Sequence, residues 1–156
     1  MDLLLLALIS LTAPDRPDRT PKIDGPIHQA MQGKWHFVSA TLGDVTLTRS
    51  IPNQLFVTRT EISHLVFDRQ SPGQSNQRFV IHERANPVQI DLLPTQLEDR
   101  VIEGIVKIEG DTLTICVPVG AAKARPSEFR VHPRSKVITL QFRREPPGRT
   151  VIEGSR

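Results

Sequence analysis

The five histidines are the residues of this sequence best suited to bind a metal ion or to transfer a proton. His64 and His82 lie in neighbouring apolar runs and would approach each other across a hairpin, with Glu83 beside His82. A zinc site needs three or four converging ligands, and this grouping offers two. We therefore expect no metal site, and we expect all five to be solvated strand histidines: His28, His36, His64, His82 and His132.

Cys116 is the only cysteine, which excludes an intrachain disulfide. It lies inside the apolar run Leu113-Thr114-Ile115-Cys116-Val117. A reactive thiol needs a neighbouring base or a lowered pKa, and the sequence shows neither. We expect a buried, inert thiol.

No known catalytic motif is present: the sequence has no Gly-x-Ser-x-Gly, no glycine-rich phosphate loop and no His-Glu-x-x-His. Four carboxylates are too scattered to predict an acid–base pair: Asp91, Glu103, Asp111 and Glu128. Arg125 and Glu128 flank Pro126, and we expect them to brace a loop. We favour a non-catalytic protein without a cofactor and keep an enzyme as the third alternative.

The charge pattern argues against nucleic-acid binding. The formal net charge is +3 at pH 7, and the basic residues are spread along the 156-residue chain. Nucleic-acid sites combine clustered cations with aromatic side chains on which bases stack. Because no such stripe is present, we expect no nucleic-acid partner.

The N-terminal region predicts export. Leu3 to Leu11 is an apolar run that is too short to span a bilayer but suits a secretory signal, with Ala13 as the candidate cleavage residue. Two features argue against this. No Lys or Arg precedes the run, only Asp2 after Met1, and Leu11, two residues before Ala13, is large for a cleavage site. An uncleaved anchor is the alternative, and a cytoplasmic location follows if the segment is not a signal.

We divide the chain into a signal segment (1–13), a proline-rich linker (14–26), a β-barrel (27–145) and a flexible tail (146–156).

The remaining sequence predicts an all-β domain. Thirteen prolines and nine glycines separate short runs with alternating apolar residues. In the first run Trp35 and Phe37 are expected to point inward, on the same face as Ser39 and Thr41, and Gly43-Asp44 makes the turn. Residues 49–61 are expected to be a loop or a short helix over one mouth of the barrel.

About eight short strands follow one another, mostly in hairpin order. Gly110-Asp111 predicts a tight hairpin turn. Closure into an antiparallel up-and-down barrel would remove exposed edges, and a sandwich is the alternative. The expected strands after the first are 45–48, 62–67, 77–83, 88–92, 101–109, 112–118, 127–131 and 137–144.

Five segments carry a family resemblance: Met31-Gln32-Gly33-Lys34-Trp35, Pro87-Val88-Gln89-Ile90-Asp91, Gly104-Ile105-Val106, Glu109-Gly110-Asp111-Thr112-Leu113-Thr114-Ile115-Cys116 and Arg125-Pro126-Ser127-Glu128-Phe129. By their order and spacing, residues 27–144 resemble an uncharacterised lipocalin-like domain family that is abundant in planctomycete bacteria. The chain departs from the family pattern at Met31, where leucine is usual, and at Val106, where an aromatic residue is usual.

The resemblance implies a lipocalin-like barrel but no assigned activity. In lipocalins the tryptophan of Gly-x-Trp closes the floor, and an arginine late in the last strand packs across it. Arg143 or Arg144 would take that place here, and parity with Phe142 favours Arg144. The residues expected to act structurally are Gly33, Trp35, Gly110, Asp111 and Arg144.

Our leading prediction is an exported, lipocalin-like barrel that binds a small apolar ligand without catalysis. The alternative is a structural or protein-interaction barrel with a filled core, because such barrels either hold a ligand or pack their interior. The sequence identifies no ligand, predicts no stable membrane span and leaves the oligomeric state open. The candidate liners, whose simpler interpretation is packed core, are Phe37, Phe79, Ile90, Val106, Ile115 and Leu140.

Overall fold

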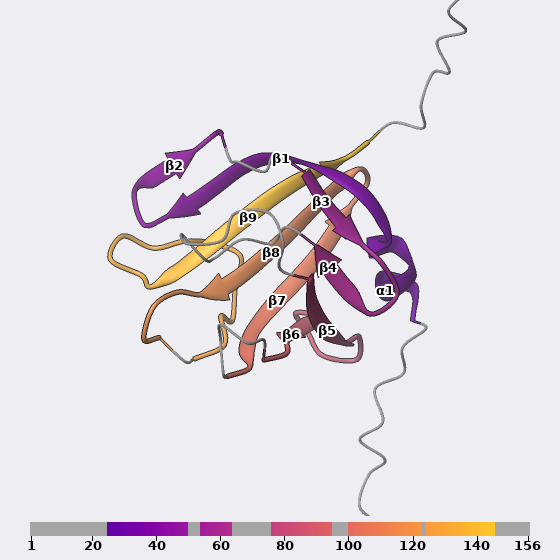
Figure 1. The fold of residues 1–156 in the computed structure, drawn as a ribbon. Coiled ribbons are helices and arrows are strands. Elements are labelled where there is room, and N and C mark those ends of the chain that lie inside the picture. The colour runs from indigo at the N-terminus through magenta and orange to yellow at the C-terminus, as the bar shows by residue number, and fades with distance from the viewer. Residues whose placement is uncertain (1–24, 50–53, 64–75, 95–99, 123, 146–156) are drawn as a thin grey trace, which may run out of the picture.

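A computed structural model describes residues 25–49, 54–63, 76–94, 100–122 and 124–145 (Figure 1). The structure is nearly all β, with one short helix at its start. The elements are α1 (Pro26–Met31), β1 (Gly33–Leu42), β2 (Val45–Leu47), β3 (Gln54–Val57), β4 (Glu61–Ser63), β5 (Asn76–His82), β6 (Gln89–Leu92), β7 (Ile102–Glu109), β8 (Thr112–Pro118) and β9 (Val137–Arg144).

Eight of the strands close into a barrel. Each strand from β3 to β8 pairs antiparallel with the next, β1 pairs with β3, and β1 also pairs with β9 to complete the ring. The ninth strand, β2, pairs only with the far end of β1. The predicted antiparallel up-and-down barrel is therefore confirmed, its form is compatible with a lipocalin-like fold, and the sandwich alternative is excluded.

A β-bulge divides β1 into two halves. The register with β9 shifts by one residue between Phe37 and Ser39, so that Val38 is an extra residue. Before the bulge β1 pairs with β3, and after it β1 pairs with β2. The bulge reverses the predicted faces: Ala40 pairs with the buried Leu140 and faces the interior, whereas Ser39 faces outward and its hydroxyl donates to the outward Gln141.

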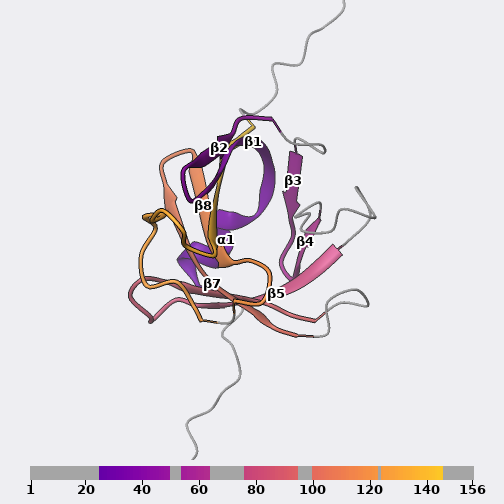
Figure 2. The same cartoon turned by 90° about the vertical axis from the view of Figure 1, so that its left-hand side faces the viewer.

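The barrel has two different ends. Figure 2 looks into the ring of strands from the side of β2, and α1 is seen lying across the far end (Figure 2). We call the end beside α1 the floor and the end beside the β1–β2 hairpin the open end. At the floor Met31 and Trp35 are fully buried, so a short helix and the tryptophan fill this end.

Two sequence predictions about local structure are wrong. Residues 49–61 were expected to be a loop or a short helix, but Gln54–Val57 is a strand of the barrel wall. Only two of its residues, Leu55 and Val57, face inward. An alternation this short, directly after Pro52-Asn53, could not be recognised in the sequence. Residues 127–131 do not form a strand. Instead, they belong to a segment, residues 124–136, that lies on the outside of the barrel and that we call the strap.

Several other predictions fall outside the described residues. The predicted signal segment, residues 14–24 of the predicted linker, the predicted tail and His64 all lie there. No helix in the described part of the chain is long and apolar enough to cross a lipid bilayer.

Trp35→Ala should lower the free energy of unfolding by about 3–5 kcal/mol, because it removes the largest fully buried side chain of the floor. Urea unfolding followed by far-UV circular dichroism measures this loss. Val38→Ala, at a half-exposed position, is the matched control and should change the value by less than about 0.5 kcal/mol. An unchanged urea midpoint for Trp35→Ala would contradict the role of Trp35 as a plug.

Candidate functional site

The floor is centred on a contact between Trp35 and Arg144. The two residues are direct partners across the β1–β9 ladder, and the guanidinium carbon of Arg144 lies 4.2 Å from the centroid of the indole ring. The indole Nε1 donates to the carbonyl oxygen of Met31 at 2.8 Å. The indole ring thus has a cation on its face, and its N–H has a hydrogen-bond acceptor. The arginine that packs on Trp35 is Arg144, the one that strand parity favoured over Arg143.

Arg144 also holds the C-terminal end of α1. Its Nη1 donates to the carbonyl oxygen of Gln32 at 3.1 Å, and its Nη2 donates to that of Ala30. Gly33 makes room for this arrangement, because its φ is +120° and a Cβ there would lie 3.3 Å from Nη1. Carbonyl groups at a helix end lack partners within the helix and favour a cation.

The other end of α1 is held by a carboxylate. The backbone N–H of His28 donates to Oε1 of Glu83 at 2.8 Å, and a Cβ on Gly25 would collide with this carboxylate at 1.9 Å. The buried imidazole of His28 donates from Nε2 to the carbonyl oxygen of Arg59 at 2.7 Å. Its Nδ1 has no hydrogen-bond partner among the described residues. His28 is therefore a buried part of the floor and not a solvated strand histidine.

The strap is held to the outer face of the barrel by Arg125. Its guanidinium donates to the carbonyl oxygen of Gly104 at 2.7 Å, to Oδ1 of Asp91 at 2.6 Å and to Oε1 of Glu103 at 3.2 Å. A Cβ at Gly104 would lie 2.6 Å from a methyl group of Val117, so this strand position accommodates only glycine. Arg125 thus braces the strap against β6 and β7.

Cys116 lies under the strap and is fully buried. Its Sγ donates to the carbonyl oxygen of Glu128 at 3.8 Å and accepts from the hydroxyl of Thr139 at 3.3 Å. Burial raises the pKa of the Cys116 thiol, and the hydrogen bond from Thr139 only partly offsets this effect. The thiol is therefore structural and faces the outer layer, not the barrel interior.

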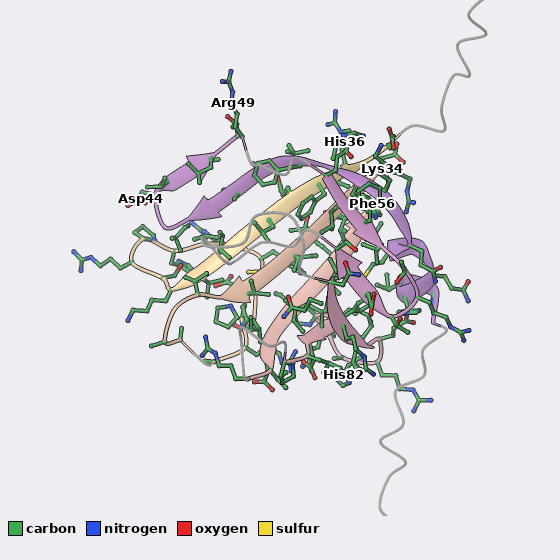
Figure 3. The ribbon with its side chains drawn as sticks, in the orientation of Figure 1. Lys34, His36, Asp44, Arg49, Phe56 and His82 are labelled. Carbon is green, nitrogen blue, oxygen red and sulfur yellow. The ribbon has the colours of Figure 1, made fainter. Side chains whose placement is uncertain are left out.

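Three other histidines each meet a carboxylate. His82 Nε2 lies 2.7 Å from Asp91, His132 Nε2 lies 2.7 Å from Glu128, and His36 Nε2 lies 3.4 Å from Glu145. These pairs are on separate parts of the surface, as the labelled His36 and His82 illustrate (Figure 3). Across the described segments, no three histidine, cysteine or carboxylate side chains gather to hold a metal ion.

Glu145 forms the centre of a small charged cluster on the outside of the floor. Its carboxylate lies 2.9 Å from Nζ of Lys34, and the hydrogen bond from Lys34 lowers the pKa of Glu145, with a smaller contribution from His36. Since these side chains are exposed, the pairs stabilise the fold little. The cluster adds no catalytic geometry.

The six candidate liners all belong to or pack against the core. Ile90 and Ile115 have no exposed surface, and Val106 has almost none. Phe79 and Leu140 are slightly exposed, whereas Phe37 is half-buried, with its ring centroid 5.9 Å from that of Phe142. The wall is therefore tightly packed at some of the proposed positions and less so at others.

The structure adds an apolar surface that sequence analysis did not single out. Leu42, Val45 and Leu47 are 41%, 61% and 57% exposed. Leu42 pairs with Val45, and Leu47 pairs with the inward Ala40, so that all three share the face of the barrel interior. We call these three residues the apolar lip. Sequence alternation alone missed it, because the extra residue Val38 reverses the parity.

Comparison of the chain with family models, with curated proteins and with solved structures finds no match. The candidate sites therefore stand on their geometry alone, and the fold by itself fixes no function.

Cys116 should react slowly with a thiol reagent such as dithionitrobenzoate. The thiolate is the reacting form, and both the raised pKa and the strap oppose its reaction. We expect native protein at about pH 8 to react at least about 100-fold more slowly than protein in concentrated guanidinium chloride.

Arg125→Gln should accelerate this native reaction, because it removes the contacts that hold the strap. Arg130→Gln, at an exposed strap residue, is the control and should leave the rate unchanged. A native rate that equals the denatured rate would show that the strap does not protect Cys116.

Proposed function

We propose that this chain is an exported, lipocalin-like barrel that binds a small apolar molecule at its open end, without catalysis. The observation that carries the proposal is the contrast between a filled floor and an exposed apolar surface at the opposite end. The family resemblance of residues 27–144 supports the same type of protein.

The lower interior leaves no room for a ligand. Met31, Trp35 and Leu55 have no surface that water can reach. A side chain in this state borders neither solvent nor an internal void large enough for a water molecule. A ligand therefore has to bind above this layer, towards the open end.

The open end offers the surface that such a ligand needs. Leu42 lies opposite Ile138 on β9, and Ala40 lies opposite Leu140, so the apolar lip continues the interior wall beyond the rim of the barrel. A contiguous exposed apolar surface of this kind typically marks a binding site. Burial of apolar area against a ligand would stabilise the complex by roughly 25 cal/mol per Å².

The chemistry of this face indicates an uncharged, mainly hydrocarbon ligand. The described inward residues near the open end are aliphatic, apart from aromatic Phe37 and the buried amide of Gln77, whereas Phe79 lies against His28 at the floor. That amide already donates to the carbonyl oxygen of Leu93. Because the described inward residues supply no charged group there, an ionised head group would lose hydration without gaining a partner from them.

The ligand proposal can be tested with the neutral apolar dye N-phenyl-1-naphthylamine. We expect saturable fluorescence enhancement with the natural barrel, and at least about tenfold weaker binding after Leu42→Asp, because a carboxylate on the apolar lip opposes burial. Phe56→Asp is the matched control: Phe56 is 37% exposed but lies between the inward Leu55 and Val57, so it faces outward. The control should bind the dye normally.

Native mass spectrometry of protein purified from its own host provides the second measurement. A bound small apolar molecule supports the carrier. An unliganded mass together with no dye uptake would contradict it and favour the filled, structural or protein-interaction barrel.

Export is a separate part of the proposal and rests on the apolar run from Leu3 to Leu11. Expression of the full chain in its host should give a mature protein that lacks residues 1–13 and is found outside the cytoplasm. Intact-mass measurement of the purified protein checks this. A full-length cytoplasmic product would contradict export and leave the ligand proposal standing.

A further inference from the structure

Among the described strands, β2 stands outside the closed ring and has an unpaired outer edge. In the strand order of the sheet β2 is terminal, with β1 as its only partner among the described strands. It stands at the upper left of the molecule, and no labelled element lies above it (Figure 1). Its residues Val45, Thr46 and Leu47 are all exposed. Unpaired strand edges are templates for another strand.

From this edge we propose that two copies of this chain pair through β2, antiparallel and around a two-fold axis at Thr46. The occupant of the edge is thus a second copy of the same chain. This inference does not rest on ligand binding.

The hairpin geometry determines which backbone groups are free. Leu42 and Val45 close the two-residue turn Gly43-Asp44, and such a closing pair exchanges both of its backbone hydrogen bonds. Hydrogen-bonded and non-hydrogen-bonded pairs alternate along an antiparallel ladder. The N–H and C=O of Thr46 therefore point away from β1, toward the open edge.

A two-fold axis perpendicular to the sheet at Thr46 uses these groups. The N–H and C=O of Thr46 in one copy meet the C=O and N–H of Thr46 in the other. The next hydrogen-bonded pair on each side joins Asp44 to Thr48 of the second copy. The same axis keeps the interior faces of both copies on the same side, so the two apolar lips become continuous.

The side chains in this register complement one another. Val45 lies opposite Leu47 of the second copy, and Leu47 lies opposite Val45. These are non-hydrogen-bonded pairs, in which the side chains approach most closely. Both residues are more than half exposed in the single chain, so the pairing would cover the two most exposed apolar side chains of the apolar lip.

The flanking charges favour the antiparallel orientation. Asp44 precedes β2 and Arg49 follows it, and the two side chains stand at opposite ends of the strand (Figure 3). No other described residue pairs with either of them. Antiparallel pairing places the Arg49 of each copy beside the Gly43-Asp44 turn of the other, whereas parallel pairing would place like charges together.

The size of the contact implies a reversible dimer. A strand of three residues buries less area than the roughly 1,200 Å² typical of stable protein complexes. We therefore expect monomer and dimer to exchange, with the dimer populated at high protein concentration and weakened by salt.

Sedimentation velocity from about 5 µM to about 1 mM protein measures this equilibrium, and we expect the weight-average mass to rise toward that of a dimer. Thr46→Pro should raise the dimer dissociation constant at least about tenfold, because it removes the free N–H at an edge position that tolerates proline. Thr46→Val keeps that N–H and is the matched control. A monomer at every concentration, or a dimer unaffected by Thr46→Pro, would overturn the proposal.

A charge exchange tests the orientation without altering the backbone. Arg49→Asp should weaken the dimer, because it brings acidic residues together at both ends of the paired strands. Combining it with Asp44→Arg should restore the dimer, because the opposite charges again face each other. Failure of the double variant to recover would rule out the antiparallel register. Circular dichroism of each variant verifies that the barrel is folded.

Discussion

The stacking of Arg144 on Trp35 is the interaction on which the rest of the barrel depends. It joins the last strand to the first, where the ring closes, and the same guanidinium binds the carbonyl groups at the end of α1. A partly buried cation favours such partners, because it loses part of its hydration. Loss of either residue would therefore weaken three things together: the closure of the ring, the position of the helix and the seal of the floor.

The helix itself is too short to be stable alone. Its six residues are fixed from outside, with the Glu83 carboxylate at the beginning and the Arg144 guanidinium at the end. Both charges have the sign that the helix dipole favours. The floor is thus a tertiary assembly, whereas the β1–β2 hairpin at the open end has neighbours on one edge only. The floor therefore has more tertiary contacts to hold it than the projecting hairpin has.

Much of the barrel could be predicted from the sequence because its strongest signals are local. The alternation of apolar residues from Ile102 to Pro118 and from Val137 to Arg144 correctly predicted which side chains face the barrel interior. Gly110 has the positive φ that its turn requires. Parity also favoured the arginine that lies on Trp35. These features depend on a few neighbouring residues, which a single sequence contains.

The features that escaped prediction depend on contacts between distant residues. Nothing near Arg125 in the sequence shows that it will meet Asp91 and the carbonyl group of Gly104. The partners of His36 and His82 are distant in the sequence or on another strand, and the position of His28 depends on Arg59 and Glu83. Residues 127–131 were expected to form a strand, but the strap is held by side-chain contacts such as those of Arg125 and not by a ladder.

Val38 has a consequence for how related sequences would be compared. As the extra residue of the bulge, it could be lost by a single-codon deletion without changing which residues of β1 face inward. Such a deletion would straighten the strand at the point where its neighbour changes from β3 to β2. The bend that separates the hairpin from the ring would then be lost. In an alignment this would appear as a one-residue gap, yet it would mark the presence or absence of the bend that directs the hairpin away from the ring.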